Sequence, residues 1–208
     1  MTDKLSKRRV RQMRILVLYG PNLNLLGTRE PEIYGTLTLD EINQEIIIYA
    51  EKLNQGLSMK SGTEQIELDY FQSNHEGVLI DTIQEAQQRY EGIIYNPAAH
   101  THYSIALRDA IASISIPVVE VHLTDISQRE DFRSVSVMKD VCIGQCMGRH
   151  IDSYKEALDM LVAQITARGE EGQRKASEWG KADAMGSGGA RSETGGDRGV
   201  VYAERSDE

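Results

Sequence analysis

The sequence predicts an α/β protein built on an open parallel sheet. Short apolar runs with strand character recur along the middle of the chain, and segments with helical periodicity lie between them. Compact apolar strands of this kind are typical of parallel sheets that helices cover on both faces. Five strands with four or five helices indicate a flavodoxin-like fold, an open parallel five-stranded sheet with helices on both faces.

The five predicted strands are short apolar runs bounded by more polar sequence, as expected of buried strands. In an open α/β sheet, ligands bind outside the carboxyl ends of the strands. The loops after the first, third and fourth strands are therefore the candidate site loops. The strands are predicted at Arg14–Leu18, Gln65–Phe71, Gly92–Tyr95, Pro117–Val121 and Val141–Gly144.

Four helices are predicted from apolar positions that recur with helical period. The first begins at a capping box, in which Thr38 is the N-cap and Glu41 reaches back to it, and Gly56 is its predicted stop. Its apolar face comprises Leu39, Ile42, Ile46, Ala50 and Leu53. The others are predicted at Glu76–Arg89, at Tyr103–Ser113, and along a stripe of Ile151, Tyr154, Leu158, Leu161, Val162 and Ile165.

The length and composition suit one compact domain, with additional residues outside it. The chain has 208 residues, of which 40% are hydrophobic, and a domain of about 150 residues accounts for the patterned part. We predict this domain over residues 14–167, after a basic N-terminal tail at residues 1–13. Residues 168–208 are rich in Gly, Ser and charge and lack a periodic apolar face, so we expect them to be largely disordered.

Charge and cysteine content argue against several classes of protein. The net charge of −9 disfavours non-specific binding to nucleic acid or anionic membranes. We expect no secretory signal and no membrane span. Cys142 and Cys146 make no disulfide framework, so a cytoplasmic location is the default. We interpret the basic start as a solvated tail in preference to a contact with nucleic acid or an acidic partner; its cations are Lys4, Lys7, Arg8, Arg9, Arg11 and Arg14.

The first candidate loop is "GPNLNLLGTREPEIYG", directly after the first strand. Asn22 is positioned to face a ligand, and Arg29 and Tyr34 follow at a spacing that suits a lid over a pocket. Asn and Gly are also ordinary turn formers. The loop lacks both Gly-rich phosphate-binding fingerprints, so a phosphate loop is the weaker interpretation.

The second candidate loop is "NPAAHTHYSIALRDA", which begins at Asn96 where the third strand ends. His100 and His102 suggest a metal site, but two His without a nearby Cys or Glu are a poor ligand set for zinc. Thr101 or His102 near a helix start would alternatively leave backbone N–H groups for an anion. Arg108 and Asp109 also fit a solvated helix face, so the sequence leaves these alternatives open.

The third candidate loop is "EVHLTDISQREDFR". Glu120 and His122 point to the same face of a strand, because strand side chains alternate with period two. A carboxylate beside a histidine fixes the tautomer and favours the protonated ring, which is what a general acid needs. A paired structural histidine would look the same. Arg129 and Arg133 share one helical face, and either meet an anion or pair with neighbouring carboxylates.

Four motifs together resemble the type II 3-dehydroquinate dehydratases. They are the three loops above and "QSNHEG", and the similarity runs in order over roughly residues 14–162. The resemblance implies trans-dehydration of 3-dehydroquinate to 3-dehydroshikimate through an enolate, with no cofactor and no metal. The reaction belongs to aromatic amino acid biosynthesis by the shikimate pathway or to quinate catabolism. A homo-oligomer is also implied, a dodecamer built from trimers.

The resemblance also implies roles for individual residues. Tyr34 matches the base, Arg29 the lid residue that tunes it, and Arg129 an arginine near that tyrosine. Asn22 matches a residue that holds a water against the enolate, and His122 the general acid with Glu120 behind it. The positions that match substrate-binding residues are Asn96, His102, Arg133, the backbone of Leu123 and Thr124, and Asp109, which family members contribute across a trimer interface.

The implied chemistry fits these residue types. Tyr is a weak acid with a reference pKa near 10, so it serves as a base at neutral pH only if cations stabilise its phenolate. Arg29 and Arg129 would provide those charges. Ala98 and His150 depart from the family pattern, because glycine often stands at both positions. Two alternatives remain: a non-catalytic binding domain on the same sheet, and a flavin carrier suggested by the fold alone.

Overall fold

A computed structural model describes residues 11–60 and 64–186 of the chain. The chain separates into two compact units, residues 1–168 and 169–208. The first unit contains the whole sheet, and the described residues of the second unit, 169–186, are helical. No helix in the described ranges is both long enough and apolar enough to span a membrane.

The sheet has five parallel strands in the order β2-β1-β3-β4-β5. They are β1 (Arg11–Tyr19), β2 (Glu64–Gln72), β3 (Gly92–Asn96), β4 (Val118–Val121) and β5 (Gly144–Cys146). The chain moves outward from β1 to β2 on one side and from β3 to β5 on the other. The topological switch point therefore lies between β1 and β3, which confirms the flavodoxin-like prediction and marks where a ligand site is expected.

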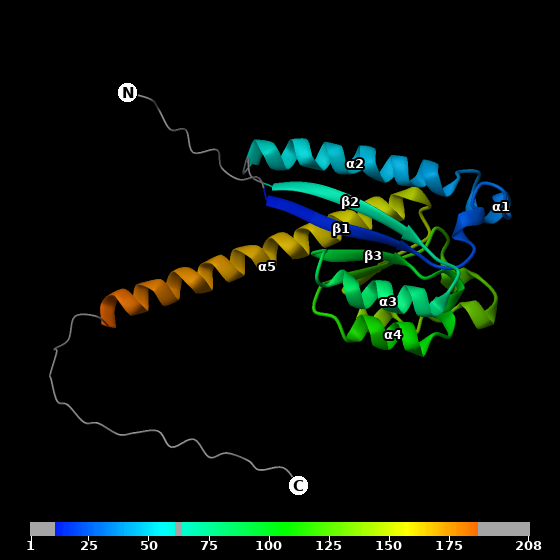
Figure 1. Cartoon of the computed structure of the whole chain (residues 1–208). Coiled ribbons are helices and arrows are strands. Elements are labelled where there is room, and N and C mark those ends of the chain that lie inside the picture. The colour runs from blue at the N-terminus through cyan, green and yellow to red at the C-terminus, as the bar shows by residue number, and fades with distance from the viewer. Residues whose placement is uncertain (1–10, 61–63, 187–208) are drawn as a thin grey trace, which may run out of the picture. The chain divides into compact units, whose positions relative to one another are not determined.

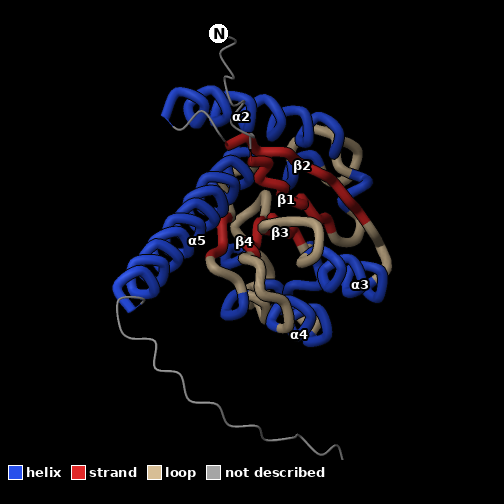
Figure 2. The backbone as a smooth tube through the Cα atoms, turned by 60° about the vertical axis from the view of Figure 1, so that its left-hand side comes forward, coloured by secondary structure: helices blue, strands red, loops and turns tan. Residues whose placement is uncertain are grey.

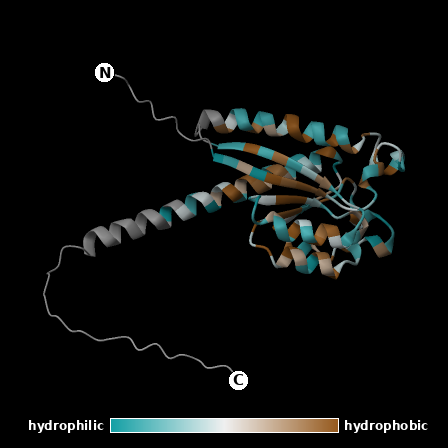
Figure 3. Cartoon of the chain, in the orientation of Figure 1, coloured by the Kyte–Doolittle hydropathy of each residue, from teal (hydrophilic) through white to brown (hydrophobic). Residues whose placement is uncertain are grey.

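Two helical layers cover the sheet, and Figures 1 and 2 show α2 and the α3–α4 pair on opposite sides of the strands. The helices are α2 (Leu39–Lys60), α3 (Glu76–Ala86), α4 (Ile105–Ala112) and α5 (Ile151–Gly186). Ile46 of α2 and Leu158 of α5 are buried in one core, while Ile83 of α3 and Leu107 of α4 are buried in the other. Figure 3 shows the matching concentration of hydrophobic residues in the central strands.

The boundaries of several predicted elements were wrong. β1 begins at Arg11 because its register with β2 pairs Arg11 with Glu64, so residues 11–13 belong to the sheet and not to a tail.

The predicted capping box is present: the Thr38 N–H donates to Glu41 Oε2 at 2.8 Å, and the Glu41 N–H donates to Thr38 Oγ1 at 3.2 Å. Gly56 does not stop α2, because one glycine costs a helix only about 1 kcal/mol.

The end of the domain also differs from the prediction. A 3₁₀ turn occupies Lys139–Val141, and β5 lies at Gly144–Cys146 instead of Val141–Gly144. α5 continues to Gly186, although residues 168–208 were expected to be largely disordered. This stretch is rich in Glu, Gln, Arg, Lys and Ala, which are strong helix formers, and extending an existing helix needs no new nucleus. Residues 187–208 lie outside the described ranges.

Two of the predicted basic-tail residues pair with carboxylates of the same chain. Arg11 Nη2 lies 2.8 Å from Glu91 Oε1, and Arg14 Nη2 lies 2.7 Å from Asp69 Oδ2. These pairs support the solvated-surface interpretation at both positions. Lys4, Lys7, Arg8 and Arg9 fall outside the described residues.

Ala98 and His150, the two departures from the resembled family, both adopt left-handed backbone conformations. Their φ angles are +51° and +49°. A left-handed residue with a Cβ costs roughly 1–2 kcal/mol, and glycine avoids that cost. The local backbone therefore explains why glycine suits both positions.

Replacing Ala98 by Gly is expected to leave the free energy of unfolding unchanged or to raise it by up to about 1 kcal/mol, because relief of backbone strain offsets the greater entropy of the unfolded chain. The matched control is Ala106→Gly on the exposed face of α4, where the same change should cost about 1 kcal/mol. Urea unfolding of both variants measures the difference. Equal destabilisation in the two variants would show that position 98 is not strained.

Candidate active site

One pocket gathers side chains from all three candidate loops at the carboxyl ends of β1, β3 and β4. The sequence-predicted site residues that line it are Arg29, Tyr34, Asn96, His102, His122, Leu123, Thr124, Arg129 and Arg133. Leu23, Ala98, Ala99 and Ile126 complete the lining. These four small or apolar residues carried no chemical signal in the sequence, but they give the pocket its apolar wall.

Tyr34 lies between two arginine side chains. It ends a short helix, α1 (Pro31–Tyr34), that the sequence patterns did not predict. Arg129 Nη1 donates to the Tyr34 hydroxyl at 3.3 Å, and the guanidinium carbons of Arg129 and Arg29 lie 5.6 and 5.0 Å from the centre of the Tyr34 ring. The hydrogen bond to Tyr34 is the largest of the effects that raise the pKa of Arg129. Negative charge on the phenol oxygen would therefore be stabilised here.

The Tyr34 segment lies between two glycines with left-handed backbone. Gly27 and Gly35 have φ angles of +87° and +85°. A Cβ on Gly27 would lie 2.8 Å from Thr38 Cγ2, so glycine is favoured there by both conformation and space. The segment that carries Arg29 and Tyr34 thus has a glycine at each end, which are suitable positions for a hinge.

His122 and Glu120 form a buried pair at the end of β4. His122 Nε2 lies 2.7 Å from Glu120 Oε1, and both side chains are almost fully buried. The Nε2 atom therefore carries hydrogen toward the carboxylate, and Nδ1 is the ring atom left to face the pocket. This geometry matches the orientation expected of a general acid whose partner carboxylate lies behind it.

Three further side chains surround the Glu120 carboxylate. Thr101 Oγ1 donates to Oε1, Ser136 Oγ lies 2.9 Å from each carboxylate oxygen, and Gln145 Nε2 donates to Oε2 at 3.0 Å. Burial alone raises the pKa of Glu120, but the hydrogen bond and charge of His122, with the bonds from Thr101 and Ser136, outweigh it and lower the pKa. The sequence argument considered Thr101 only as an anion-site residue and missed Ser136 and Gln145.

His102 has one ring nitrogen occupied by the protein. Its Nδ1 lies 2.9 Å from the carbonyl oxygen of Val135, so Nδ1 carries the hydrogen and Nε2 is free to accept one. Burial is the largest effect on this ring and lowers the pKa of His102. A neutral His102 can therefore accept a hydrogen bond from a hydroxyl group in the pocket.

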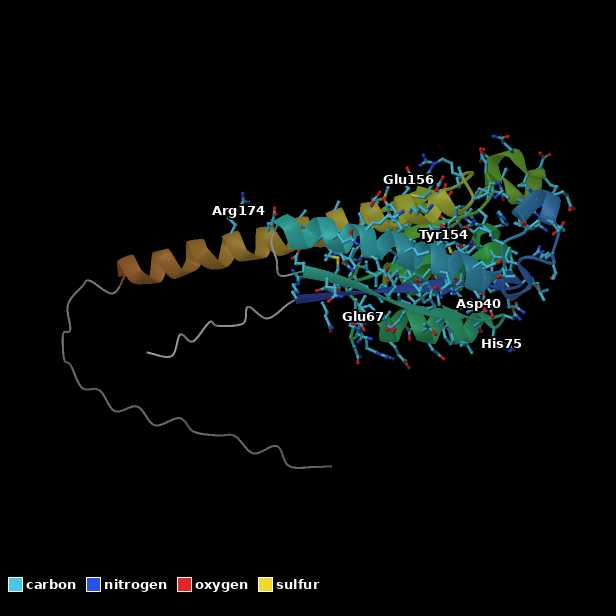
Figure 4. All side chains as sticks on the ribbon, turned by 90° about the horizontal axis from the view of Figure 1, so that it is seen from above. Asp40, Glu67, His75, Tyr154, Glu156 and Arg174 are labelled. Carbon is cyan, nitrogen blue, oxygen red and sulfur yellow. The ribbon has the colours of Figure 1, made fainter. Side chains whose placement is uncertain are left out.

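Asn96 and the turn after β4 supply further polar groups. Asn96 is buried, and its Nδ2 donates to the hydroxyl of Tyr154 at 2.7 Å; Tyr154 lies in the first turns of α5 and is labelled in Figure 4. Within the described ranges, the N–H groups of Leu123 and Thr124 have no hydrogen-bond acceptor. Two free N–H groups at the pocket wall suit an anionic or carbonyl oxygen.

Three of the predicted residues lie outside the pocket lining: Glu120, which lies behind His122, and Asn22 and Asp109. Asn22 is exposed with φ +65°, and its backbone N–H donates to Asn74 Oδ1 at 2.8 Å. Asp109 is exposed on α4 and pairs with Arg108 at 3.4 Å. Neither Asn22 nor Asp109 contacts the Tyr34–His122 region within this chain.

The two histidines of the second loop make different contacts. His100 packs edge-on against Tyr103, with ring centres 5.8 Å apart, while His102 bonds the Val135 carbonyl. Among residues 11–60 and 64–186, no three His, Cys, Asp or Glu side chains are grouped so as to hold a metal ion. Ser104 caps α4, where its side chain accepts from the Leu107 N–H at 3.0 Å.

A family model described as "Dehydroquinase class II" matches residues 13–162, which include every residue of this pocket. The chain belongs to the class II dehydroquinase family. The match covers more than half of the chain and includes the strands from which the three site loops extend.

Relatives and solved structures agree with this membership. The 3-dehydroquinate dehydratase of Geotalea daltonii is 53% identical over 153 residues, covering 74% of this chain and 99% of the relative. The enzyme of that name from Bacillus subtilis is 48% identical over 149 residues, covering 72% and 93%. The crystal structure of the type II dehydroquinase from Butyrivibrio crossotus is 45% identical, covers 72% of this chain and 97% of that one, and has a TM-score of 0.65.

Membership in the class II dehydroquinases explains why these side chains share one pocket. The pocket places a tyrosine flanked by arginines at one wall and a histidine backed by a carboxylate at another. A tyrosine and a histidine on different walls of one pocket are residue types that can exchange protons with two positions of one bound molecule.

Proposed function

We propose that this class II dehydroquinase dehydrates 3-dehydroquinate to 3-dehydroshikimate, in the shikimate pathway or in quinate catabolism. The observation that carries the proposal is the pocket in which Arg129 bonds the Tyr34 hydroxyl while His122, backed by Glu120, lines another wall. The family and the curated relatives support the same reaction. Tyr34 and His122 then have the two roles that a dehydration needs.

The first step in our proposal is removal of a proton beside the ketone. The Tyr34 phenolate takes the proton, which leaves an enolate and a neutral phenol. Arg129 and Arg29, whose guanidinium groups lie beside Tyr34, stabilise the phenolate before transfer. Arg29 also pairs with Glu30, its Nε 3.1 Å from Oε2, which holds it on the lid segment.

The second step is loss of the hydroxyl group two carbons from the carbonyl. The enolate electrons reform the carbonyl and a carbon–carbon double bond forms as the C–O bond breaks. Hydroxide is a poor leaving group, so His122 donates a proton through Nδ1 and water departs. Glu120 stabilises the protonated ring before transfer. The proton gained by Tyr34 returns to His122 through solvent before the next turnover.

Substrate positioning is assigned to the polar groups of the other walls. The neutral His102 accepts from a substrate hydroxyl, and Arg133 with the free N–H groups of Leu123 and Thr124 binds the carboxylate. Asn96 contributes its amide from the end of β3. For Asn22 we propose that it holds a water molecule at the enolate. Asn22 is exposed in the described conformation, so this role requires the Gly27–Gly35 segment to close over the pocket.

We further propose that the enzyme is a homo-oligomer, a dodecamer built from trimers, in which a second copy covers the surface beside the pocket. Large apolar side chains are exposed on the segments that carry His102 and Arg133: Tyr103, Ile105, Phe132 and Val135 are 56–70% exposed. Asp109 lies one helical turn after Ile105 on the same face of α4. A cytoplasmic location is also proposed, since both cysteines are free thiols.

If Asp109 completes the site of a second copy, Asp109→Ala should raise KM several-fold while kcat changes less, because the residue binds substrate without transferring protons. Asp81→Ala, an exposed aspartate of α3, is the matched control and should leave both constants unchanged. Steady-state kinetics and sedimentation are measured on both variants. A monomeric preparation with full activity would contradict the shared site.

The proposed reaction is tested by adding 3-dehydroquinate to the purified protein and following the ultraviolet absorbance of the conjugated enone. Absorbance should rise at a rate proportional to enzyme concentration. Borohydride added with the substrate should not inactivate the enzyme, because no lysine lines the pocket in the described structure and a Schiff base requires one. Absence of product would favour a non-catalytic binding domain, and irreversible inactivation by borohydride would exclude the Tyr34 mechanism.

A further inference from the structure

We propose that Ser136 and Gln145 are positioning residues for the reaction, which keep Glu120 ionised and thereby keep His122 oriented as the acid. The inference rests on the proposed function and extends it to two residues that lie outside the four motifs quoted above. It follows from the direction in which each hydrogen bond around Glu120 must run.

The hydroxyl of Ser136 is a donor in the cluster around Glu120. Its oxygen accepts the N–H groups of Met138 at 3.2 Å and Lys139 at 3.1 Å, which occupy both lone pairs. The single hydroxyl hydrogen has two acceptors in reach, Thr101 Oγ1 at 3.0 Å and the Glu120 carboxylate at 2.9 Å through either oxygen, and the charged carboxylate is the stronger of the two. The backbone of the following turn thus fixes Ser136 as a donor.

The carboxylate of Glu120 is consequently surrounded by donors. His122 and Thr101 donate to Oε1, Gln145 donates to Oε2, and Ser136 lies between the two oxygens. A carboxylate accepts about four hydrogen bonds, so its capacity is filled. A proton on Glu120 would displace one of these bonds in a site where the side chain has no exposure to water.

Other titratable groups face this carboxylate from every element packed on it. His122 follows on β4, Tyr95 lies on β3, His102 lies on the 3₁₀ helix that carries Thr101, and Cys142 precedes β5. Burial raises the pKa of Tyr95 and raises that of Cys142 to about 12, so both are neutral near pH 7. His102 is neutral as argued above, and His122 is the titratable residue that bonds Glu120 directly, at 2.7 Å.

Ser136 also belongs to a segment that is bonded to the site at three consecutive residues. The Val135 carbonyl accepts from His102, the Ser136 hydroxyl donates to Glu120, and the Val137 N–H donates to the Thr101 carbonyl at 2.8 Å. This segment begins two residues after Arg133. The acid pair and the proposed carboxylate-binding arginine are therefore held by one stretch of chain.

The sign of the expected pH effect follows from the direction of the shift at Glu120. Its pKa is lowered in the folded protein, so its stabilising charge is present above the unfolded value of about 4.3 and is lost as pH falls through the lowered value. Burial opposes ionisation, so removing a donor lets the pKa rise. The acid limb of the kcat profile should then move to higher pH.

The experiment compares Ser136→Ala with Ser134→Ala, an exposed serine just before that segment whose hydroxyl donates to the Asp131 carbonyl. Ser136→Ala should lower kcat about 10-fold, a part of what a general acid supplies, with KM within about 2-fold of wild type. Its acid limb should rise by about one pH unit, and Ser136→Thr should restore most of both properties. Ser134→Ala should match wild type throughout.

A second variant protects the test against misfolding. Gln145→Glu keeps the shape of the side chain but replaces the donor with a carboxylate, so the acid limb should rise further than in Ser136→Ala. Circular dichroism checks that each variant folds. Loss of kcat in folded variants without a shift of the acid limb, or no change in either property, would overturn the proposal.

The result can also be read without turnover. The ¹⁵N chemical shifts of the His122 ring, followed against pH in substrate-free protein, should show the pair titrating at higher pH in both variants. If wild-type protein fails to convert 3-dehydroquinate but the ring shifts move as expected, the proposed function fails and this inference stands. If the variants leave the pH dependence of the His122 ¹⁵N shifts unchanged while the wild-type enzyme converts 3-dehydroquinate, the role of Ser136 and Gln145 is contradicted and the proposed function stands.

Discussion

Tyr34→Phe should lower turnover of 3-dehydroquinate by about 10²–10⁴-fold, the range that a lost general base costs. Phe keeps the ring between Arg29 and Arg129 and removes only the oxygen that Arg129 bonds at 3.3 Å. The free energy of unfolding should change by about 1 kcal/mol or less, since the lost hydrogen bond is partly exposed. Steady-state kinetics and urea unfolding measure the two effects.

The control for this variant is Tyr49→Phe. Tyr49 lies on α2, and its hydroxyl bonds Asp159 at 2.8 Å, so the same atom is lost outside the pocket. Tyr49→Phe should retain wild-type turnover. Exchange of the substrate α-proton with deuterated solvent, followed by NMR, should vanish in Tyr34→Phe. Exchange at the wild-type rate would show that another group is the base.

His122→Ala should lower turnover by a similar factor but at a different step. The variant leaves Tyr34 and both arginines in place, so the enolate still forms, while the hydroxyl leaves without a proton donor. Exchange of the α-proton should therefore persist although enone formation nearly stops. Loss of the imidazole also leaves Glu120 without the side chain that bonds it at 2.7 Å, and this buried carboxylate should destabilise the protein by a few kcal/mol.

Two comparisons make the His122 result specific. His75→Ala removes an exposed histidine before α3, labelled in Figure 4, and should leave turnover unchanged. The double variant His122→Ala with Glu120→Gln removes the unpaired charge, so it should recover part of the lost stability without recovering turnover. If His122→Ala stops exchange and elimination equally, His122 acts before the enolate forms.

The order of strands and helices was predictable because each element has a strong local signal. The apolar runs of β3 and β4 and the capping box at Thr38 depend on neighbouring residues, and these elements were found nearly where predicted. The wrong predictions fell on elements whose sequence pattern is weak. β5 has only three residues, and the prediction put the strand too early. The helical residues after Arg168 lack an apolar stripe, so propensity was the sole signal there.

The candidate site was partly predictable for a related reason. Residues with distinctive chemistry, such as Tyr34, His122 and Arg129, were found by motif, and they do line one pocket. Ser136 and Gln145 belong to residue types that are common on surfaces, and they lie 16 and 25 positions from Glu120. Their importance depends on where the folded chain brings them, which no local pattern reports. The roles of Asn22 and Asp109 remain predictions.

The donors around Glu120 come from four separate stretches of chain, and the last of them lies on β5, the final strand to be synthesised. Contacts between distant segments form late in folding, after local helices. During refolding from denaturant, the far-ultraviolet helical signal should therefore return before dehydratase activity does. The lag between the two signals would include the time that β4 and β5 need to assemble around the acid.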